Sequence, residues 1–523
     1  MRCLSSSRVF LCSTLLSLAV GSAVDVNMLV ILPKENSYLF SITRVRPAID
    51  YAIQNLVQSP FNFSVKYVDS ECGNMALFHL VDICLVQKPD VIVGPVCDYA
   101  SAPVARLASY WKIPMVSAGA LASGFAHKKP EYSHLTRVSP AYSKMGEMFL
   151  AMFRRYRWKR VALVFEDDLQ ERNCYFTVGG VDHAFKQDDI PIYSTVISED
   201  MDEVEIGHKV EELKENVRIV IMCASSQNIR KVMLEAHRQG MTKGDYVFFN
   251  IELFNSSTFG NGSWKQGDAF DSVAKQAYRS LQTVTLLRTA KQKFYKFAAD
   301  MKNRSRQQLN YKDDNVNMFV EGFHDAVLLY TKALQEVLNQ GYSKTDGERI
   351  VHQMWNTTFE GIAGQVSIDA NGDRYGDYSV IGMTDPEAGT HEVIADYYGM
   401  NGSFEVRPSV RRLWASGVPP SDESCCGFPK DHASTCKSCG IGESAVTGIV
   451  VGSLLGCALL LAFYLFRKKY RITIERRVQL LEADTGKIHL IVQHHCTGSV
   501  ISAKMIKHDS VCIIEASSDL TDN

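Results

Sequence analysis

The sequence predicts an α/β fold with two doubly wound lobes of parallel sheet, followed by one transmembrane helix. Three observations lead to this prediction. Short apolar runs alternate with segments of helical spacing, this alternation occurs in two successive series, and one uncharged stretch near the C-terminus is long enough to cross a bilayer.

The first series comprises apolar runs at 26–32, 63–68, 90–96 and 114–118, with helical spacing at 45–57 and 101–111. After Ser143 a helix leads to a second series, with runs at 160–165, 192–197, 217–224 and 246–254. Strands rich in Val and Ile that alternate with helices indicate parallel sheets with right-handed crossovers. Ligands of such sheets bind at the carboxyl ends of the strands, in or near the crevice between lobes.

Later segments, including a long helix at 315–340, are expected to cross back and complete each sheet. We place lobe 1 at about 24–140 and 282–345, and lobe 2 at about 141–281 and 346–406.

The N-terminal segment has the layout of a secretory signal peptide. Met1–Ala23 contains Arg2 and Arg8, an apolar run from Val9 to Val20, and small residues before a cleavage point, so the mature chain starts near Val24. The run is too short to span a bilayer, and the alternative is a buried N-terminal helix.

Residues 445–466 carry no charge and reach about 33 Å as a helix, enough to cross the hydrocarbon core. Lys and Arg at 467–469 and 471 mark the cytoplasmic flank, so the N-terminal part faces outward. We therefore expect a single-pass type I protein of the plasma membrane, with a cytoplasmic tail at 467–523 that is too short for a catalytic domain.

The composition is that of an ordinary globular protein, with 46% hydrophobic residues and a net charge of −2, so nothing suggests nucleic acid binding. Acceptor motifs for N-glycosylation all precede the transmembrane segment, which agrees with an extracellular domain. They are Asn62, Asn255, Asn261, Asn303, Asn356 and Asn401.

Of the 14 cysteines, nine fall between the signal and the transmembrane segment, an odd number that leaves one thiol free or bonded to another chain. Cys425, Cys426, Cys436 and Cys439 lie in a stretch at 407–444, rich in Pro, Ser and Gly, that we interpret as a flexible stalk. Cysteines in adjacent stalks pair readily between chains, although pairing within one stalk remains an alternative.

Gly448, Gly452 and Gly456 form two overlapping G-x-x-x-G units in the transmembrane segment. Three glycines on one helix face allow two helices to approach closely. The motif alone is common, but together with the stalk cysteines it favours a homodimer.

Catalytic and metal-binding motifs are not found in the sequence, so we expect neither an enzyme nor a metal site. The run at 369–373 starts like a calcium loop, but Arg374 occupies the glycine position and Val380 the glutamate position. Asn371-Gly372 is better interpreted as a hairpin turn. His324-Asp325 is interpreted as core packing in a helix.

Aromatic residues next to charged ones occur at several loop positions, including Asp98-Tyr99, Glu131-Tyr132 and Tyr175-Phe176. Aromatic rings bury large areas and carboxylates pair with basic side chains, so these pairs suit a peptide-binding surface. A structural role for each pair is the alternative.

Long strings of the sequence resemble the natriuretic peptide receptors of the clearance type. Among them are DSECGNMALFHLVD, GPVCDYASAPVARLASYW, EYSHLTRVSPAYSKMGEM and FEGIAGQVSIDANGDRYGD. The resemblance runs from about Val26 to Arg407 and again from Cys436 to Arg477. It implies a type I periplasmic-binding-protein-like ectodomain that binds natriuretic peptides between two receptor chains and internalises them without cyclase activity.

Carried over by motif, the resemblance also implies roles for individual residues. Disulfides would join Cys72 to Cys97 and Cys174 to Cys223, with Cys84 a buried thiol and Cys436 with Cys439 the interchain position. A chloride ion would be held by Ser70, Val96 and Cys97. The peptide surface would comprise Asn74, Tyr99, Arg106, Glu131, Tyr132, Tyr175 and Phe176.

Two features depart from the family pattern. The tail beyond Arg477 is more apolar than the short polar tails of the family, which puts coupling to an inhibitory G protein in doubt here. Cys425-Cys426 also lies outside the pattern. The competing hypotheses are a truncated or decoy form of a guanylyl-cyclase-type receptor, and a small-molecule receptor that encloses its ligand between the lobes of one chain.

Overall fold

The computed structural model describes residues 23–481 except 57–59, 170, 199, 254–261, 288–290, 310, 312–315, 411–412 and 423–442. The expected signal peptide, the stalk cysteines, Asn255, Asn261 and the tail beyond 481 lie outside the described residues. The chain divides into two compact units, residues 1–436 and 437–523.

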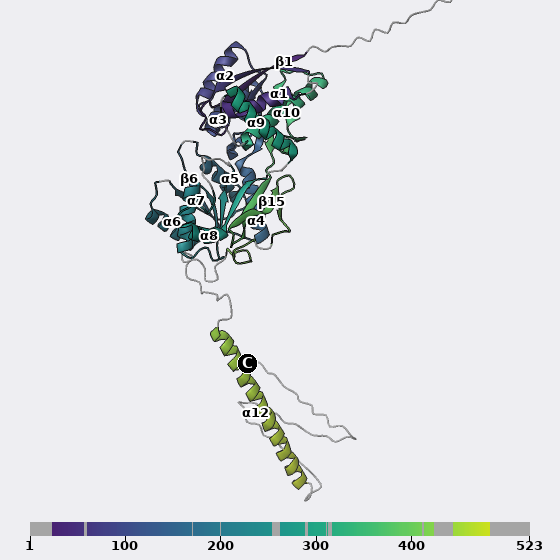
Figure 1. Cartoon of the computed structure of the whole chain (residues 1–523). Helices are drawn as coiled ribbons and strands as arrows, with labels where there is room; N and C mark the ends of the chain where they lie inside the picture. Colours follow the sequence, from purple (N-terminus) through teal and green to yellow (C-terminus); the bar gives the residue numbers. More distant parts are fainter. Residues whose placement is uncertain are drawn as a thin grey trace, which may run out of the picture. The chain divides into compact units, whose positions relative to one another are not determined.

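The first unit contains two eight-stranded sheets, one in each lobe (Figure 1). In lobe 1 the strand order is β11-β12-β13-β5-β4-β3-β1-β2, and the first five strands along the chain are parallel. These strands are β1 (Val24–Leu32), β2 (Phe61–Asp69), β3 (Val91–Val93), β4 (Met115–Ser117), β5 (Leu135–Pro140), β11 (Thr357–Glu360), β12 (Gln365–Ile368) and β13 (Asp373–Arg374).

In lobe 2 the strand order is β16-β15-β14-β10-β9-β8-β6-β7, with β6 to β10 parallel and β14 to β16 antiparallel. These strands are β6 (Val161–Glu166), β7 (Ile192–Ile197), β8 (Ile219–Cys223), β9 (Val247–Ile251), β10 (Leu281–Leu286), β14 (Tyr378–Asp385), β15 (Thr390–Tyr398) and β16 (Ser403–Val406).

Helices cover both faces of each parallel sheet. In β1, Val30 and Leu32 belong to one buried apolar cluster while Leu29 and Ile31 belong to another, so consecutive side chains are buried on opposite faces. Lobe 1 carries α1 (Ile42–Gln54), α2 (Met75–Val86), α3 (Asp98–Trp111), η1 (Ser123–Ala126), α9 (Gln292–Leu309), α10 (Met318–Asn339) and α11 (Gly347–Met354). Lobe 2 carries α4 (Tyr142–Tyr156), α5 (Asn173–Gln187), α6 (Glu203–Asn216), α7 (Ser226–Arg238), α8 (Asp271–Ala277) and η3 (Tyr278–Ser280). The predicted doubly wound α/β class is confirmed.

The lobe bounds differ from those that we expected after residue 281. The strand at 281–286 pairs with β9 in lobe 2, whereas 357–374 remains in lobe 1, where Asp373 pairs with Arg137 of β5. Lobe 1 therefore contains about 292–374, because α9, α10 and α11 pack there before the chain crosses back at β14.

Two smaller predictions concern the segment around 324–374. His324 and Asp325 are buried in α10 and their side chains contact each other, as expected for core packing. Asn371 and Gly372 lie in the turn between the antiparallel strands β12 and β13, and Gly372 has a φ of +77°. The hairpin is therefore present, and its glycine takes a left-handed conformation that favours this residue.

The expected flexible stalk begins later than we placed it. Trp414 is buried against Tyr156 and Trp158, and the indole N–H of Trp158 donates to the carbonyl of Pro420 at 2.8 Å. Asp422 accepts hydrogen bonds from the backbone N–H groups of Lys159 and Arg160. This stretch thus packs on lobe 2 through the buried side chains of Trp414, Pro420 and Asp422, although Val418 stays exposed.

The second unit contains the helix α12 (Glu443–Leu481). Within it, Val451–Arg471 is long and apolar enough to cross a membrane, and no other helix among the described residues meets that criterion. The predicted span at 445–466 and its three glycines lie in this helix.

Candidate functional site

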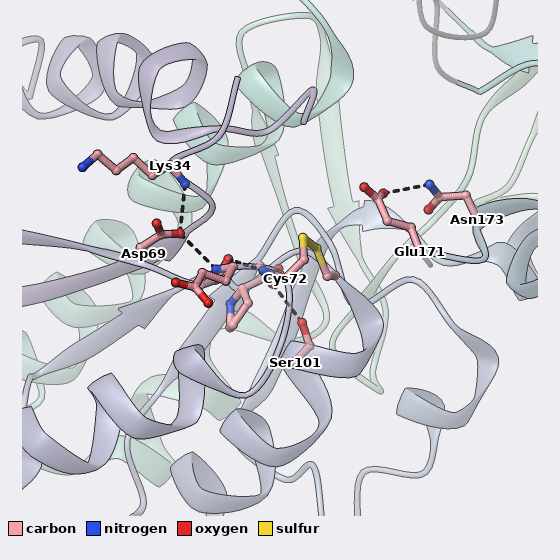
Figure 2. The surroundings of a disulfide bond; sticks show 11 residues. Lys34, Asp69, Cys72, Ser101, Glu171 and Asn173 are labelled. Carbon is pink, nitrogen blue, oxygen red and sulfur yellow. Dashed lines mark hydrogen bonds between the residues drawn. A yellow bond between two sulfur atoms is a disulfide. The ribbon is translucent and has the colours of Figure 1, made fainter. Parts of the chain in front are cut away.

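Two disulfides lie at the carboxyl ends of parallel strands, one in each lobe. Cys72, just after β2, is bonded to Cys97, which precedes α3 (Figure 2). Cys174 on α5 is bonded to Cys223 at the end of β8. These are the pairs that the resemblance implies, and each ties a helix start to a neighbouring strand end. Cys84, expected to be buried, is only half-buried on α2.

The three residues expected to bind chloride meet beside the first disulfide. Ser70 is buried in the turn after β2, and its Oγ accepts a hydrogen bond from the backbone N–H of Cys72 at 3.3 Å. Val96 and Cys97 immediately precede α3, a helix of 14 residues whose N-terminus carries partial positive charge. A hydroxyl and a helix start suit an anion, so the donor set fits chloride.

Three of the expected peptide-binding aromatic residues form a chain of ring contacts that joins the lobes. Tyr99 on α3 packs edge-to-face on Phe176 of α5, with ring centroids 5.5 Å apart, and Phe176 packs on Tyr175 at 5.3 Å. Tyr99 is 51% exposed and Tyr175 40% exposed. An exposed aromatic surface therefore spans both lobes.

Arg172, which the sequence gave no reason to select, supports this surface. Its guanidinium lies 3.8 Å from the centroid of the Tyr175 ring and is held by the carboxylate of Asp167 at 2.5 Å. Hydrogen bonds to Asp167 and to Tyr99 raise the pKa of Arg172. The residue takes a left-handed conformation before α5, which no sequence motif revealed.

The remaining expected peptide contacts come from α3, from the start of α2 and from the segment before β5. Arg106, two turns after Tyr99, pairs with Glu131 at 2.9 Å and lies over the ring of Tyr132 at 5.2 Å. Tyr132 is only 8% exposed, because it packs on Phe125. Asn74 is exposed at the start of α2. The structure thus presents Asn74, Arg106 and Glu131 to solvent but turns the Tyr132 ring inward.

A pocket of about 200 Å³ opens between the lobes behind the aromatic surface. Lobe 1 contributes side chains from the ends of its strands and from α3 and α10, and lobe 2 contributes the starts of α4 and α5. The lining residues are Tyr38, Phe40, Glu71, Cys72, Val96, Cys97, Asp98, Tyr99, Leu121, Tyr142, Glu171, Asn173 and Phe319.

Two carboxyl groups in this pocket have shifted pKa values. Burial raises the pKa of Asp98 to about 6, although the N–H of Ala122 and the charge of Arg137 favour its ionised form. Burial also raises the pKa of Glu171, which accepts a hydrogen bond from Asn173 at 2.9 Å (Figure 2).

Comparisons with known proteins agree with this architecture. The model of the receptor family ligand binding region matches residues 44–385. The chain is 59% identical to human atrial natriuretic peptide receptor 3 over 477 residues, covering 88% of this chain and 87% of that protein. The chain belongs to the atrial natriuretic peptide receptor family.

Comparison with two further members of the family shows which type of receptor this chain resembles more. Rat atrial natriuretic peptide receptor 3 is 57% identical over 478 residues, which cover 89% of each protein. Rat atrial natriuretic peptide receptor 2 is 30% identical over 465 residues, but this match covers only 44% of its length. The likeness to receptor 3 thus extends over nearly the whole of both chains.

Four of the expected glycosylation acceptors fall within the described residues. Asn62, Asn303, Asn356 and Asn401 are all exposed. Each side chain is therefore accessible to modification, which stays a prediction.

Proposed function

We propose that the chain is a cell-surface receptor that binds natriuretic peptides and clears them by internalisation. The observation that carries this proposal is the exposed ring chain of Tyr99, Phe176 and Tyr175, on a chain that is 59% identical to human atrial natriuretic peptide receptor 3. Exposed aromatic rings backed by a rigid scaffold are typical anchors of peptide interfaces.

The proposed peptide surface combines these rings with polar groups along α3. Arg106 and Glu131 form an exposed ion pair that can exchange partners with charged groups of a peptide. Asn74 adds an exposed amide at the neighbouring helix start. Tyr132 contributes indirectly, since its buried ring positions Arg106.

The proposed receptor acts without enzymatic activity and lies in the plasma membrane as a type I protein. The apolar helix at Val451–Arg471 provides the anchor. The match to receptor 3 covers most of both chains, whereas the match to receptor 2 covers only 44% of the length of receptor 2. This difference favours a clearance receptor over a cyclase-type receptor. Coupling to an inhibitory G protein is a possible further activity of the tail, whose sequence departs from the family pattern.

We further propose that two copies of the chain form the receptor. Besides the stalk cysteines and the glycines of α12, the helices α2 and α3 leave large apolar side chains exposed. They are Phe78, Leu85, Val86 and Tyr110. Apolar side chains gathered on adjacent helices are typical of protein interfaces.

Chloride would bind at Ser70, Val96 and Cys97, where it would order the turn that precedes α3.

The test is a saturation titration of labelled natriuretic peptide on membranes that contain the full chain, with glutamate as the small-molecule competitor. We expect saturable peptide binding that glutamate does not displace, uptake of the label into cells, and no rise in cyclic GMP. Absence of peptide binding would overturn the proposal, and a rise in cyclic GMP would favour the cyclase-type alternative.

A further inference from the structure

The pocket between the lobes contains charged groups that the peptide surface does not use. Asp98 and Glu71 of lobe 1 and Glu171 of lobe 2 line it, and among the described residues that line it none is Lys, Arg or His. A space of about 200 Å³ exceeds the room that a few water molecules need. The charged side chains that line the pocket are therefore carboxylates on both sides, and the space has room for a small organic molecule.

The charges of Asp98 and Glu171, which come from different lobes, act on the same phenol, and all three residues line the pocket. Burial raises the pKa of Tyr142 well above its ordinary value, and the charges of Asp98 and Glu171 raise it further. Glu171 also raises the pKa of Tyr38, after the larger effect of burial. A positive charge placed among these groups would be stabilised by both carboxylates.

Aromatic rings form much of the remaining wall. Phe40 packs on Tyr38 at 5.5 Å and edge-to-face on Phe319 at 5.0 Å, and both partners line the pocket with it. Aromatic faces attract cations, most strongly where water is excluded. Carboxylates and rings in one pocket are the combination that recognises an organic ammonium or guanidinium group.

A second, smaller compartment adjoins this pocket at Asn173, which lines both. Asn250, at the carboxyl end of β9, lines the smaller compartment and is 8% exposed, and its Oδ1 has no hydrogen-bond partner within the described part of the chain. Buried polar atoms are almost always paired, so an unpaired acceptor indicates a missing donor. This observation is independent of the carboxylates and also points to a ligand that carries N–H groups.

We propose that the crevice between the two lobes of one chain is a second binding site, which takes a small organic cation with N–H donors. Its charged group would lie between Asp98 and Glu171, and its donors would reach toward Asn250. The cation could be a free amine or a basic side chain of a bound peptide. The carboxylates of this site are not part of the peptide surface, although Tyr99 contributes to both, so binding of a free cation does not require that natriuretic peptides bind.

The experiment titrates benzylamine into the full chain in detergent by calorimetry, with benzyl alcohol as a neutral probe of similar shape. We expect benzylamine to bind and benzyl alcohol not to bind. In Glu171→Gln the affinity for benzylamine should fall at least tenfold, because one of the two charges that hold the cation is removed. The matched control is Glu211→Gln, an exposed carboxylate on α6 that does not line the pocket and should leave binding unchanged.

Thermal melting of each variant verifies folding, and Asp98→Asn provides a second variant that should also weaken binding, because Asp98 lines the same pocket from lobe 1. Repeating the titration with saturating natriuretic peptide separates the two sources. If the natural ligand is a free cation, benzylamine still binds in the presence of the peptide. If a basic side chain of the peptide occupies the pocket, the peptide prevents benzylamine from binding. Equal binding of benzyl alcohol, no binding of benzylamine, or unchanged binding in folded Glu171→Gln would overturn the proposal.

Discussion

Tyr99 connects several features of the molecule through one side chain. Its ring packs on Phe176 of the other lobe, its hydroxyl shares a hydrogen bond with Arg172, and it lines the pocket between the lobes. About half of the residue still faces solvent. Because Phe176 and Arg172 fix the ring while part of it stays exposed to solvent, the ring is pre-organised for contact with a peptide.

Replacing this ring tests whether it anchors the peptide. Tyr99→Ala should weaken natriuretic peptide binding by about 2 kcal/mol, roughly a thirtyfold rise in Kd, because truncation of an aromatic anchor removes most of its contact area. Competition binding on membranes measures the change. Tyr295→Ala is the control, since Tyr295 on α9 is 60% exposed and should leave the affinity unchanged. Wild-type affinity in Tyr99→Ala would remove this residue from the site.

Asp98 gives the molecule a defined pH response. Burial raises its pKa to about 6, so the folded state binds its proton more tightly than the unfolded state, whose carboxyl titrates near 3.8. Stability that Asp98 contributes at pH 4 is therefore lost as the pH rises through 6. Between pH 4 and pH 7, the free energy of unfolding of the wild type should fall by up to about 3 kcal/mol relative to that of Asp98→Asn. Melting curves of both proteins at several pH values measure this difference, and parallel curves would contradict it.

At the scale of elements, a buried ion cluster attaches β13 to β5. Arg137 makes a two-pronged contact with Asp373, with N–O distances of 2.7 and 2.8 Å, and Lys128 adds a third contact at 2.8 Å. Burial alone would raise the pKa of Asp373, but Arg137 and Lys128 bring it well below its ordinary value. Burial lowers the pKa of Lys128 to about 8. The cluster fixes the returning hairpin on the first sheet.

Asp373→Asn should destabilise lobe 1 by about 3–5 kcal/mol, because it leaves two buried cations without their carboxylate. Chemical denaturation followed by circular dichroism measures the loss. Glu360→Gln serves as the control, since its pair with Lys291 is exposed and contributes at most about 1 kcal/mol. Equal stability of the two variants would show that the cluster is not needed to hold the hairpin.

Local patterns predicted most of the parallel strands, because central strands such as β1 and β8 are short apolar runs whose two faces are both buried. The strands β5 and β10 were not among the predicted runs, since each mixes polar with apolar residues. That 357–374 belongs to lobe 1 and not to lobe 2 was not predictable from such runs. It depends on pairing between Asp373 and Arg137, 236 residues apart. Trp414 was missed for a similar reason, since its contacts with Tyr156 and Trp158 are formed only in the folded lobe. The residues of the ring chain were named from the resemblance as peptide contacts, which stays a prediction, and a crevice between the lobes was expected from the fold class. Arg172 was missed, because its contacts with Asp167 and Tyr175 follow no sequence motif.

At the scale of the whole molecule, the proposed assembly of two chains rests on covalent and noncovalent contacts. The stalk cysteines lie outside the described residues, so the sequence alone supports their role. The exposed side chains of α2 provide a separate contact surface, on which Leu85 is 80% exposed. The two kinds of contact can be tested independently, because a disulfide survives denaturation and an apolar interface does not.

Cys436→Ser combined with Cys439→Ser should abolish the dimer band on non-reducing gels, since an interchain disulfide is the contact that persists in detergent. The same variant should still dimerise in native sedimentation if α2 and α3 hold the chains together. Adding Leu85→Asp should then produce monomers, because a buried unpaired carboxylate opposes association. Cys84→Ser is the matched control and should leave the band intact, since its half-buried thiol lies on α2 and not in the stalk. An unchanged band in the double serine variant would assign the covalent link to other cysteines, of which Cys425 and Cys426 are the nearest in sequence.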